Sequence, residues 1–541
     1  MRPRDICPSS GEQLLVLAAA LVASLIAIWW SWSHSAFLLY GDAEAHIHIA
    51  RRLFDSHRPG ITQLGSVWLP LSHLLLVPFL LVDSWWRSGF SPVIPSAGCY
   101  LLACLGLYRL MRKWISPAAA SVALAIFAAN PNLLYMQTTA MTEPLFLCEL
   151  IWSVLLLVEW YSSLESDDGR SGRLLWAVIA VLAAAVYTRY DGWILAFLAW
   201  IAMAICLARR GRLLRPNFIL ASVVLLLAPV GWMVYNAVVF GDWLDFMRGP
   251  YSARAIELRT SSSAVDPHPG WHNPWVSLVY FAKASEMDIA ALGWGELVFF
   301  AAAAGTIRAW LRYGKAQPES GESRPPARPS SWAWTLLLWL PLPFYAYSIA
   351  YGSVPIFIPP WWPHSWYNVR YGMEMLPVFA IFLAFLVYEC AELAERRWSR
   401  SEGWIILAVA ALIVVNSVVL MRARPLVLQE AVANSRTRIP YEVALANALA
   451  VLPQQGMILM YTSEHPGALQ RAGIPLKRTI NEGDYYQWPG ALERPAQSAA
   501  VVVTTDGDAV ARAVAAHPEG LTLVDVVCST GQPCARIYLS K

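Results

Sequence analysis

Residues 13–32 read QLLVLAAALVASLIAIWWSW, a mostly apolar run that closes with Trp29, Trp30 and Trp32. A helix needs about 20 apolar residues to cross the hydrocarbon core of a bilayer, and tryptophan is enriched where such helices meet the interface. The run is too long for the apolar core of a signal peptide and has no small-residue cleavage site. It therefore predicts a membrane-spanning helix.

The composition of the whole chain agrees with several such spans. Of the 541 residues, 57% are hydrophobic and 14% are charged, whereas soluble domains have about 45–50% and about 25%. The net charge of +3 gives no indication of nucleic-acid binding. The predicted fold class is a polytopic α-helical membrane protein with eleven spans, at 13–32, 92–111, 117–135, 144–161, 174–188, 193–208, 217–239, 288–308, 331–351, 371–393 and 404–421.

Lysine and arginine residues predict how the spans are oriented. If the N-terminus is cytoplasmic, the cytoplasmic segments carry 19 of these residues, and the outer loops before the C-terminal region carry fewer over many more positions. This bias predicts a cytoplasmic N-terminus and an extracytoplasmic C-terminal region. The long outer loops are then 33–91 and 240–287. Residues 316–330, AQPESGESRPPARPS, indicate a flexible cytosolic loop.

The first long loop contains a further apolar stretch, at 67–81, which is broken by Pro70, His73 and Pro78. We interpret this stretch as an interfacial or re-entrant helix. The alternative is a true span, which would reverse every later span and place the basic clusters outside.

Hydropathy falls from about residue 422, and strand-like runs then alternate with helical ones. The strand-like runs are 457–461, 499–505, 521–527 and 535–539. The chain is therefore predicted to have a membrane domain, 1–421, and a small extracytoplasmic α/β domain, 422–541. The α/β domain has no glycine-rich phosphate loop. Cys528 and Cys534 flank a turn in this domain. They could form a disulfide or remain two free thiols.

Residues that could carry chemistry begin directly after the first span, where residues 40–52 read YGDAEAHIHIARR. Ionisable groups at a membrane surface are costly unless they face water, a partner or a cavity. On a helix, Asp42 and His46 share one face, and Glu44 and His48 share another. One carboxylate could then face a cleft while other groups hold its neighbour in place. The alternative is a plain helix start, with Asp42 as the N-cap.

Three more polar clusters fall on the same predicted side of the membrane. Glu143 lies at the outer junction of the third and fourth spans, Arg189 and Asp191 lie in the turn YTRYDGW, and Arg370 and Tyr371 end the segment HSWYNVRY. The structural alternative for Glu143 is a capping carboxylate, and that for Arg189 and Asp191 is an ion pair with each other or with a neighbouring helix. The structural alternative for Arg370 is an arginine that snorkels to the interface. Acids and arginines at an apolar–water boundary suit a substrate that is both lipid and phosphate.

These motifs resemble the GT-C fold glycosyltransferases that include protein O-mannosyltransferases and the aminoarabinose transferase of lipid A (glycosyltransferase family 39). The resemblance covers roughly residues 10–420. The matching motifs are GDAEAH at 41–46, WLPL at 68–71, TEP at 142–144 and NVRY at 368–371.

The resemblance implies a hexosyl- or pentosyltransferase that uses a polyprenyl-phosphate sugar at the outer face of a membrane. Asp42 matches the family's first-loop acid and would be the general base of an inverting displacement. Arg370, and then Arg189, would stabilise the leaving phosphate. Glu143 matches a second acid that orients the acceptor or the sugar. The other expected substrate-binding residues are Glu44, His46, Asp191 and Tyr371.

The sequence does not predict whether the acceptor is a protein, a lipid or a glycan. The expected compartment is a bacterial inner membrane, and membrane lipids are expected as further partners. Some relatives have two adjacent acids in the first loop, whereas Ala43 separates Asp42 from Glu44 here. His46 and His48 with these acids could bind a divalent metal. The family is regarded as metal-independent, so no cofactor is expected.

Two functions of other classes stay open. A transporter or flippase for a lipid-linked or polar solute would place charges near the bilayer midplane and often has inverted repeats. No repeat is apparent here, and the polar clusters fall at one surface. A non-catalytic assembly protein of the envelope would use the C-terminal domain for its partners and would not need Asp42 as a base.

Overall fold

The computed structural model describes residues 8–260, 268–291, 293–313, 331–398, 401–453, 455–463 and 465–541, and the predicted loop 316–330 lies outside them. The chain forms two compact units. Unit 1 comprises the described residues within Met1–Trp30, Ser96–Gln137 and Thr142–Glu430. Unit 2 comprises Ser31–Pro95, Thr138–Met141 and the described residues within Ala431–Lys541.

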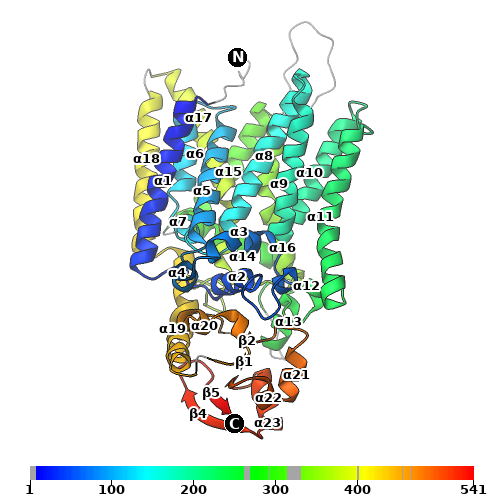
Figure 1. The fold of residues 1–541 in the computed structure, drawn as a ribbon. Helices are drawn as coiled ribbons and strands as arrows, with labels where there is room; N and C mark the ends of the chain where they lie inside the picture. Colours follow the sequence, from blue (N-terminus) through cyan, green and yellow to red (C-terminus); the bar gives the residue numbers. More distant parts are fainter. Residues whose placement is uncertain are drawn as a thin grey trace. The chain divides into compact units, whose positions relative to one another are not determined.

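Unit 1 is a helical bundle in which α8, α9, α10 and α11 pack side by side (Figure 1). The elements that lie wholly or mostly in this unit are α1 (Ser10–Ser33), α5 (Val93–Met111), α6 (Pro117–Ala128), α7 (Pro131–Met136), α8 (Glu143–Ser166), α9 (Ser171–Thr188), α10 (Tyr190–Ala208), α11 (Pro216–Phe240), α12 (Asp245–Arg248), α13 (Ala253–Thr260), α14 (Pro274–Ile289), α15 (Trp294–Tyr313), η2 (Ser331–Trp339), α16 (Pro341–Tyr351), η3 (Val369–Met375), α17 (Leu376–Glu395) and α18 (Ser401–Arg422).

Among the described residues, nine helical segments are long and apolar enough to cross a membrane, or ten if α14 and α15 form one bent span. The predicted polytopic membrane fold is confirmed, and the described residues contain nine or ten such segments where about eleven spans were predicted. The predicted span 117–135 is two shorter helices, because Asn130 caps α7 and accepts hydrogen bonds from the backbone of Asn132 and Leu133. Pro131 has no N–H with which to continue α6.

The span predicted at 288–308 is also shifted. Its first residues belong to the end of α14 at Ile289, and the apolar helix that follows, α15, begins at Trp294. The hydropathy of the sequence identified the apolar segment, but hydropathy alone does not indicate the break before α15.

Unit 2 joins the first long loop to the C-terminal part of the chain. The loop forms α2 (Gly41–Arg52), η1 (Ile61–Leu64), α3 (Leu71–Leu80) and α4 (Asp83–Ser88). Helix α3 has 10 residues, about 15 Å of helix against a hydrocarbon core of about 30 Å. It is too short to span, which agrees with an interfacial or re-entrant helix at 67–81.

The C-terminal part of unit 2 contains a sheet with strand order β2-β1-β3-β5-β4. Strand β1 pairs in parallel with β2 and β3, whereas β5 is antiparallel to β3 and β4. The elements are α19 (Leu426–Ala450), β1 (Ile458–Met460), α20 (Gly467–Ala472), η4 (Leu476–Arg478), β2 (Thr479–Ile480), α21 (Trp488–Glu493), α22 (Pro495–Ser498), β3 (Val501–Thr505), α23 (Ala509–Ala516), β4 (Leu521–Val527) and β5 (Ala535–Ser540).

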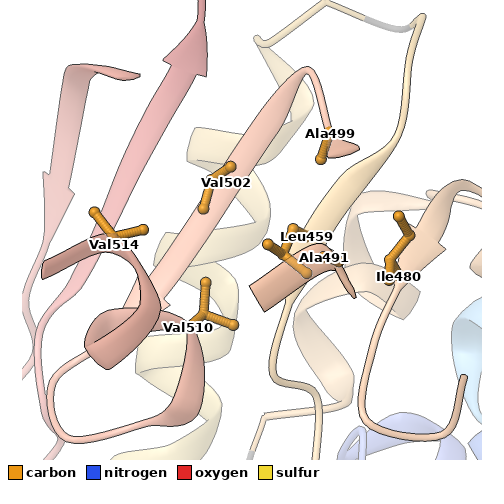
Figure 2. Close-up of a cluster of buried hydrophobic side chains, with 7 residues drawn as sticks. All are labelled: Leu459, Ile480, Ala491, Ala499, Val502, Val510 and Val514. Carbon is orange, nitrogen blue, oxygen red and sulfur yellow. The ribbon is translucent and has the colours of Figure 1, made fainter. Parts of the chain in front are cut away.

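The core of this sheet forms where its central strands meet the neighbouring helices. Leu459 of β1 and Val502 of β3 pack with Val510 and Val514 of α23 (Figure 2). The predicted α/β architecture is confirmed, and the four strand-like runs correspond to β1, β3, β4 and β5. Cys528 and Cys534 form a disulfide between β4 and β5.

The two units group the residues differently from the predicted domains. The first long loop belongs with the C-terminal strands in unit 2, and residues 422–430 belong to unit 1. The predicted boundary between a membrane domain and an extracytoplasmic domain, at residues 421 and 422, stays a prediction.

Candidate functional site

Helix α2 carries the predicted base, Asp42. The helix begins at Gly41, and the extended residue Tyr40 occupies the N-cap position without a side-chain capping bond. The structural alternative in which Asp42 is the N-cap is therefore wrong. Asp42 lies in the first turn and is half-buried, where a carboxylate interacts favourably with the helix dipole.

The two acids of α2 point to different sides of the helix. Residues two apart are separated by about 200° around a helix of 3.6 residues per turn. Glu44 is fully buried, together with Ile47, whereas Asp42 and Ala45 keep part of their surface exposed. The structure thus buries the Glu44 carboxylate completely and leaves that of Asp42 partly exposed.

Glu44 belongs to a group of four charged residues that we call the Glu44 cluster, made up of Glu44, Arg438, Glu442 and Arg471. Arg438 Nη1 donates to Glu44 Oε2 and, at 3.1 Å, to Glu442. Arg471 Nη2 donates to Glu44 Oε1 at 2.6 Å and to Glu442 Oε2 at 3.4 Å. Both carboxylates are fully buried, and each is shared by both arginines.

We expect the Glu44 cluster to make the stability of the folded protein depend on pH. Burial, together with the neighbouring Glu442 carboxylate, raises the pKa of Glu44 to about 8, although Arg438 and Arg471 act in the opposite direction. An unfolded glutamate has a pKa of about 4.3. Between these values the folded protein holds a proton that the unfolded chain releases. Stability should therefore fall as the pH rises from about 5 to about 8, by at most about 1.4 kcal/mol per pH unit.

The Glu44→Gln variant cannot titrate at this position, so its stability should change less with pH over this range. The measurement is the melting temperature, followed by tryptophan fluorescence across the range. Glu493→Gln, which changes an exposed glutamate of α21, is the matched control and should keep the wild-type slope. The same slope in Glu44→Gln as in wild type would contradict the expectation.

Histidines lie beside the acids of α2. His46 Nδ1 is 2.7 Å from His73 Nε2, and the His46 ring packs on Trp68. Burial lowers the pKa of His48 to about 3 and that of His73 well below its usual value, so both are neutral at physiological pH. Within the described ranges, no group of three or more His, Cys, Asp or Glu side chains is arranged to hold a metal ion. Independence from a metal stays a prediction.

A second charged group lies in unit 1 and is centred on Arg189, which connects α9 to α10. Its guanidinium approaches Glu374 at 3.0 Å, Asp191 at 3.3 Å and Glu143 at 3.5 Å. It also donates to the Tyr345 hydroxyl at 2.5 Å. The predicted local pair with Asp191 is present, but it is one of three carboxylate contacts from different parts of the chain.

Arg370 of η3 extends this group. Its Nε donates to Glu143 Oε1 at 3.2 Å, and its Nη1 donates to Glu430 Oε1 at 3.2 Å. The Tyr371 ring lies 5.0 Å from the guanidinium carbons of both Arg189 and Arg370. Arg370 is only 6% exposed, so the alternative of an arginine that snorkels to the interface is wrong.

Glu143, the first residue of α8, is the bridge between the two arginines. Its Oε1 atom accepts from both, and its Oε2 atom is buried without a hydrogen-bond partner. Helix α8 has no side-chain capping bond. Glu143 therefore serves the arginines rather than the end of its own helix.

The structure brings together five of the predicted residues in unit 1, namely Glu143, Arg189, Asp191, Arg370 and Tyr371. We call them, with Tyr345, Glu374 and Glu430, the Arg189 cluster. Asp42, Glu44 and His46 lie in unit 2. Sequence reasoning missed Tyr345, Glu374 and Glu430, and it missed Arg438, Glu442 and Arg471 of the Glu44 cluster. Glu374 had a usable signal, because an acid within a predicted apolar span needs a partner.

Comparisons with known proteins support the fold. A family model described as dolichyl-phosphate-mannose-protein mannosyltransferase matches residues 79–235. No curated protein sequence matches the chain. The structure is similar to that of ArnT from Cupriavidus metallidurans, with a TM-score of 0.54 for the form bound to undecaprenyl phosphate and 0.55 for the apo form. Each likeness has 13% sequence identity and covers 98% of both chains. The predicted GT-C membrane fold is confirmed.

Proposed function

We propose that the protein transfers a sugar from a polyprenyl-phosphate-linked donor to an acceptor hydroxyl at the extracytoplasmic face of a membrane. The observation that carries this proposal is the fold likeness to ArnT over 98% of both chains. The match of residues 79–235 to a mannosyltransferase family supports it independently. The sugar and the acceptor are left open by the proposal.

The proposed reaction is a single displacement with inversion at the anomeric carbon. The acceptor oxygen attacks this carbon, and the bond from carbon to the phosphate oxygen breaks. Its electron pair leaves with polyprenyl phosphate. Asp42 takes the proton of the acceptor hydroxyl as the new bond forms. Its half-exposed position in the first turn of α2 supports this role, because a base must be reachable by the hydroxyl.

The leaving group already carries negative charge, so it needs positive partners more than it needs an acid. Arg189 and Arg370 are proposed to supply them. Both are held by Glu143 Oε1, at 3.5 Å and 3.2 Å. A donor phosphate that displaces this shared contact would gain two forked donors at once. Glu143 would then be free to orient the sugar or the acceptor.

A transfer assay tests the proposal. The purified protein in nanodiscs is incubated with a panel of polyprenyl-phosphate sugars and an extract of membrane acceptors, and released polyprenyl phosphate is measured by mass spectrometry. We expect acceptor-dependent release from at least one donor, and no release in protein-free nanodiscs. The proposed independence from a metal predicts the same release in the presence of EDTA.

The absence of release from every donor, with crude acceptors present, would contradict the proposal. The transporter or flippase alternative would then be tested in proteoliposomes. There, movement of an intact labelled lipid-linked sugar across the bilayer, without loss of its sugar, would favour it.

A further inference from the structure

Helix α2 is held by segments that follow it by several hundred residues in the chain. At its start, the Gly41 N–H donates to Asn434 Oδ1 of α19 at 2.9 Å, and Glu44 accepts from Arg438 and Arg471. These contacts all lie within unit 2. The first turn, which carries Asp42, is therefore fixed by the C-terminal part of the chain.

The end of α2 is held in the same way. Asp55, just beyond the helix, accepts from the backbone N–H groups of Leu476 and Lys477 at 3.3 and 3.4 Å. Arg51 Nε donates to the same carboxylate at 2.8 Å. Movement of the helix along its axis would therefore break hydrogen bonds at both ends, and those accepted by the buried carboxylates of Glu44 and Asp55 are costly to leave unmade.

Rotation of α2 about its axis is set at Glu44. The carboxylate points about 200° away from Asp42 around the helix, and both of its oxygens are occupied by arginine donors. Arg438 is itself fixed, because its Nη2 donates to the backbone oxygens of Leu38 and Leu39 at 2.9 and 3.1 Å. A rotation that moved Asp42 would pull Glu44 away from both arginines.

Helix α20 approaches the cluster through a glycine. A Cβ atom at Gly467 would overlap the carboxylates of Glu442 and Glu44. Only a residue without a side chain lets α20 come close enough for Arg471, four residues further on, to reach Glu44. The close approach of α20 to Glu44 thus depends on the glycine at position 467.

We infer that Arg438 and Arg471 are positioning residues, which hold Glu44 and so set the direction in which α2 presents Asp42. The catalytic consequence rests on the proposed function, whereas the hold on α2 does not. Under this inference Glu44 positions the helix and does not contact substrate, in contrast to its predicted substrate-binding role.

Kinetics separates these two roles of Glu44. Glu44→Ala and Arg471→Ala should lower kcat by about 10- to 100-fold, since small displacements of a catalytic group have effects of this size. The KM for the donor should stay within about twofold, because no ground-state contact is lost. Glu44→Gln keeps an oxygen that accepts from arginine and should retain most of the activity. Arg512→Ala, at an exposed arginine of α23, is the control and should behave as wild type.

Hydrogen exchange of the backbone amides of α2 tests the hold without any substrate. We expect faster exchange over residues 41–52 in Glu44→Ala and Arg471→Ala, and wild-type exchange in Glu44→Gln and Arg512→Ala. Unchanged exchange in both alanine variants would overturn the inference. A rise in KM at constant kcat in Glu44→Ala would also overturn it and favour a substrate contact. If wild type transfers no sugar, the proposed function fails, and the exchange data still decide whether α2 is held.

Discussion

The Asp42→Asn variant is expected to lower kcat by about 100- to 10,000-fold, the range that a positioned general base contributes. Asparagine has the shape of aspartate but cannot take up the proton of the acceptor hydroxyl. The variant should stay folded, because asparagine keeps the size and shape of aspartate at this half-buried position. The measurement is the rate of polyprenyl-phosphate release, at equal amounts of protein with equal melting temperatures.

Two variants make this result specific. Asp525→Asn changes an exposed aspartate of β4 and should release polyprenyl phosphate at the wild-type rate. Asp42→Glu keeps a base that is displaced by one methylene group and should fall between wild type and Asp42→Asn. A rate for Asp42→Asn close to that of wild type would exclude Asp42 as the base, while release by the wild type would still support a transferase.

The second large effect is expected at Arg189. Its replacement by alanine should destabilise unit 1 by about 3–5 kcal/mol, the usual cost when one partner of a buried ion pair is removed. The carboxylates of Glu143, Asp191 and Glu374 are at most 2% exposed and would lose a shared counter-charge. Thermal unfolding of the purified protein measures the effect.

A largely exposed arginine provides the matched control. Arg308 is 57% exposed and pairs with the buried Glu389 at 2.8 Å, but Glu389 keeps its ion pair with Arg312 when Arg308 is removed. The loss of an exposed arginine that leaves no buried charge unpaired should cost about 0–1 kcal/mol. Arg308→Ala should therefore melt close to the wild-type temperature. If Arg189→Ala melts there as well, the Arg189 cluster does not depend on this charge.

A double variant separates structure from chemistry at the same position. In Arg189→Ala/Glu374→Gln the nearest carboxylate is neutral, so part of the lost stability should return. Sugar transfer should stay low, because the proposed contact between Arg189 and the leaving phosphate is still missing. Recovery of transfer together with stability would show that Arg189 acts only as a structural partner.

The features predicted correctly from the sequence are those encoded in neighbouring residues. Most spans and four of the five strands follow from local hydropathy and from period-two or helical patterns. The errors have local causes of another kind. The Asn130–Pro131 start of α7 divides an otherwise apolar run, and β2 has only two residues, which is too short for a pattern to be visible.

The candidate site, too, could be predicted only as far as neighbouring residues encode it. Helical spacing predicted that Asp42 and Glu44 face different sides, and the structure agrees. Which acid is held could not be predicted, because the partner of Glu44 is Arg438, 394 positions further along the chain. In the same way, no local pattern connects Arg189 with Tyr345, 156 positions away.

The attachment of α2 to α19 and α20 also sets a condition on biosynthesis. At about 5–20 residues per second, the ribosome takes roughly 20–80 s to make the 394 residues between Glu44 and Arg438. During this time the newly made first loop has none of its later partners. A nascent chain that stops before α19 would leave a charged, incompletely packed segment exposed to proteases and chaperones. Synthesis of α19 and α20 would therefore be the step after which this loop can reach its folded state.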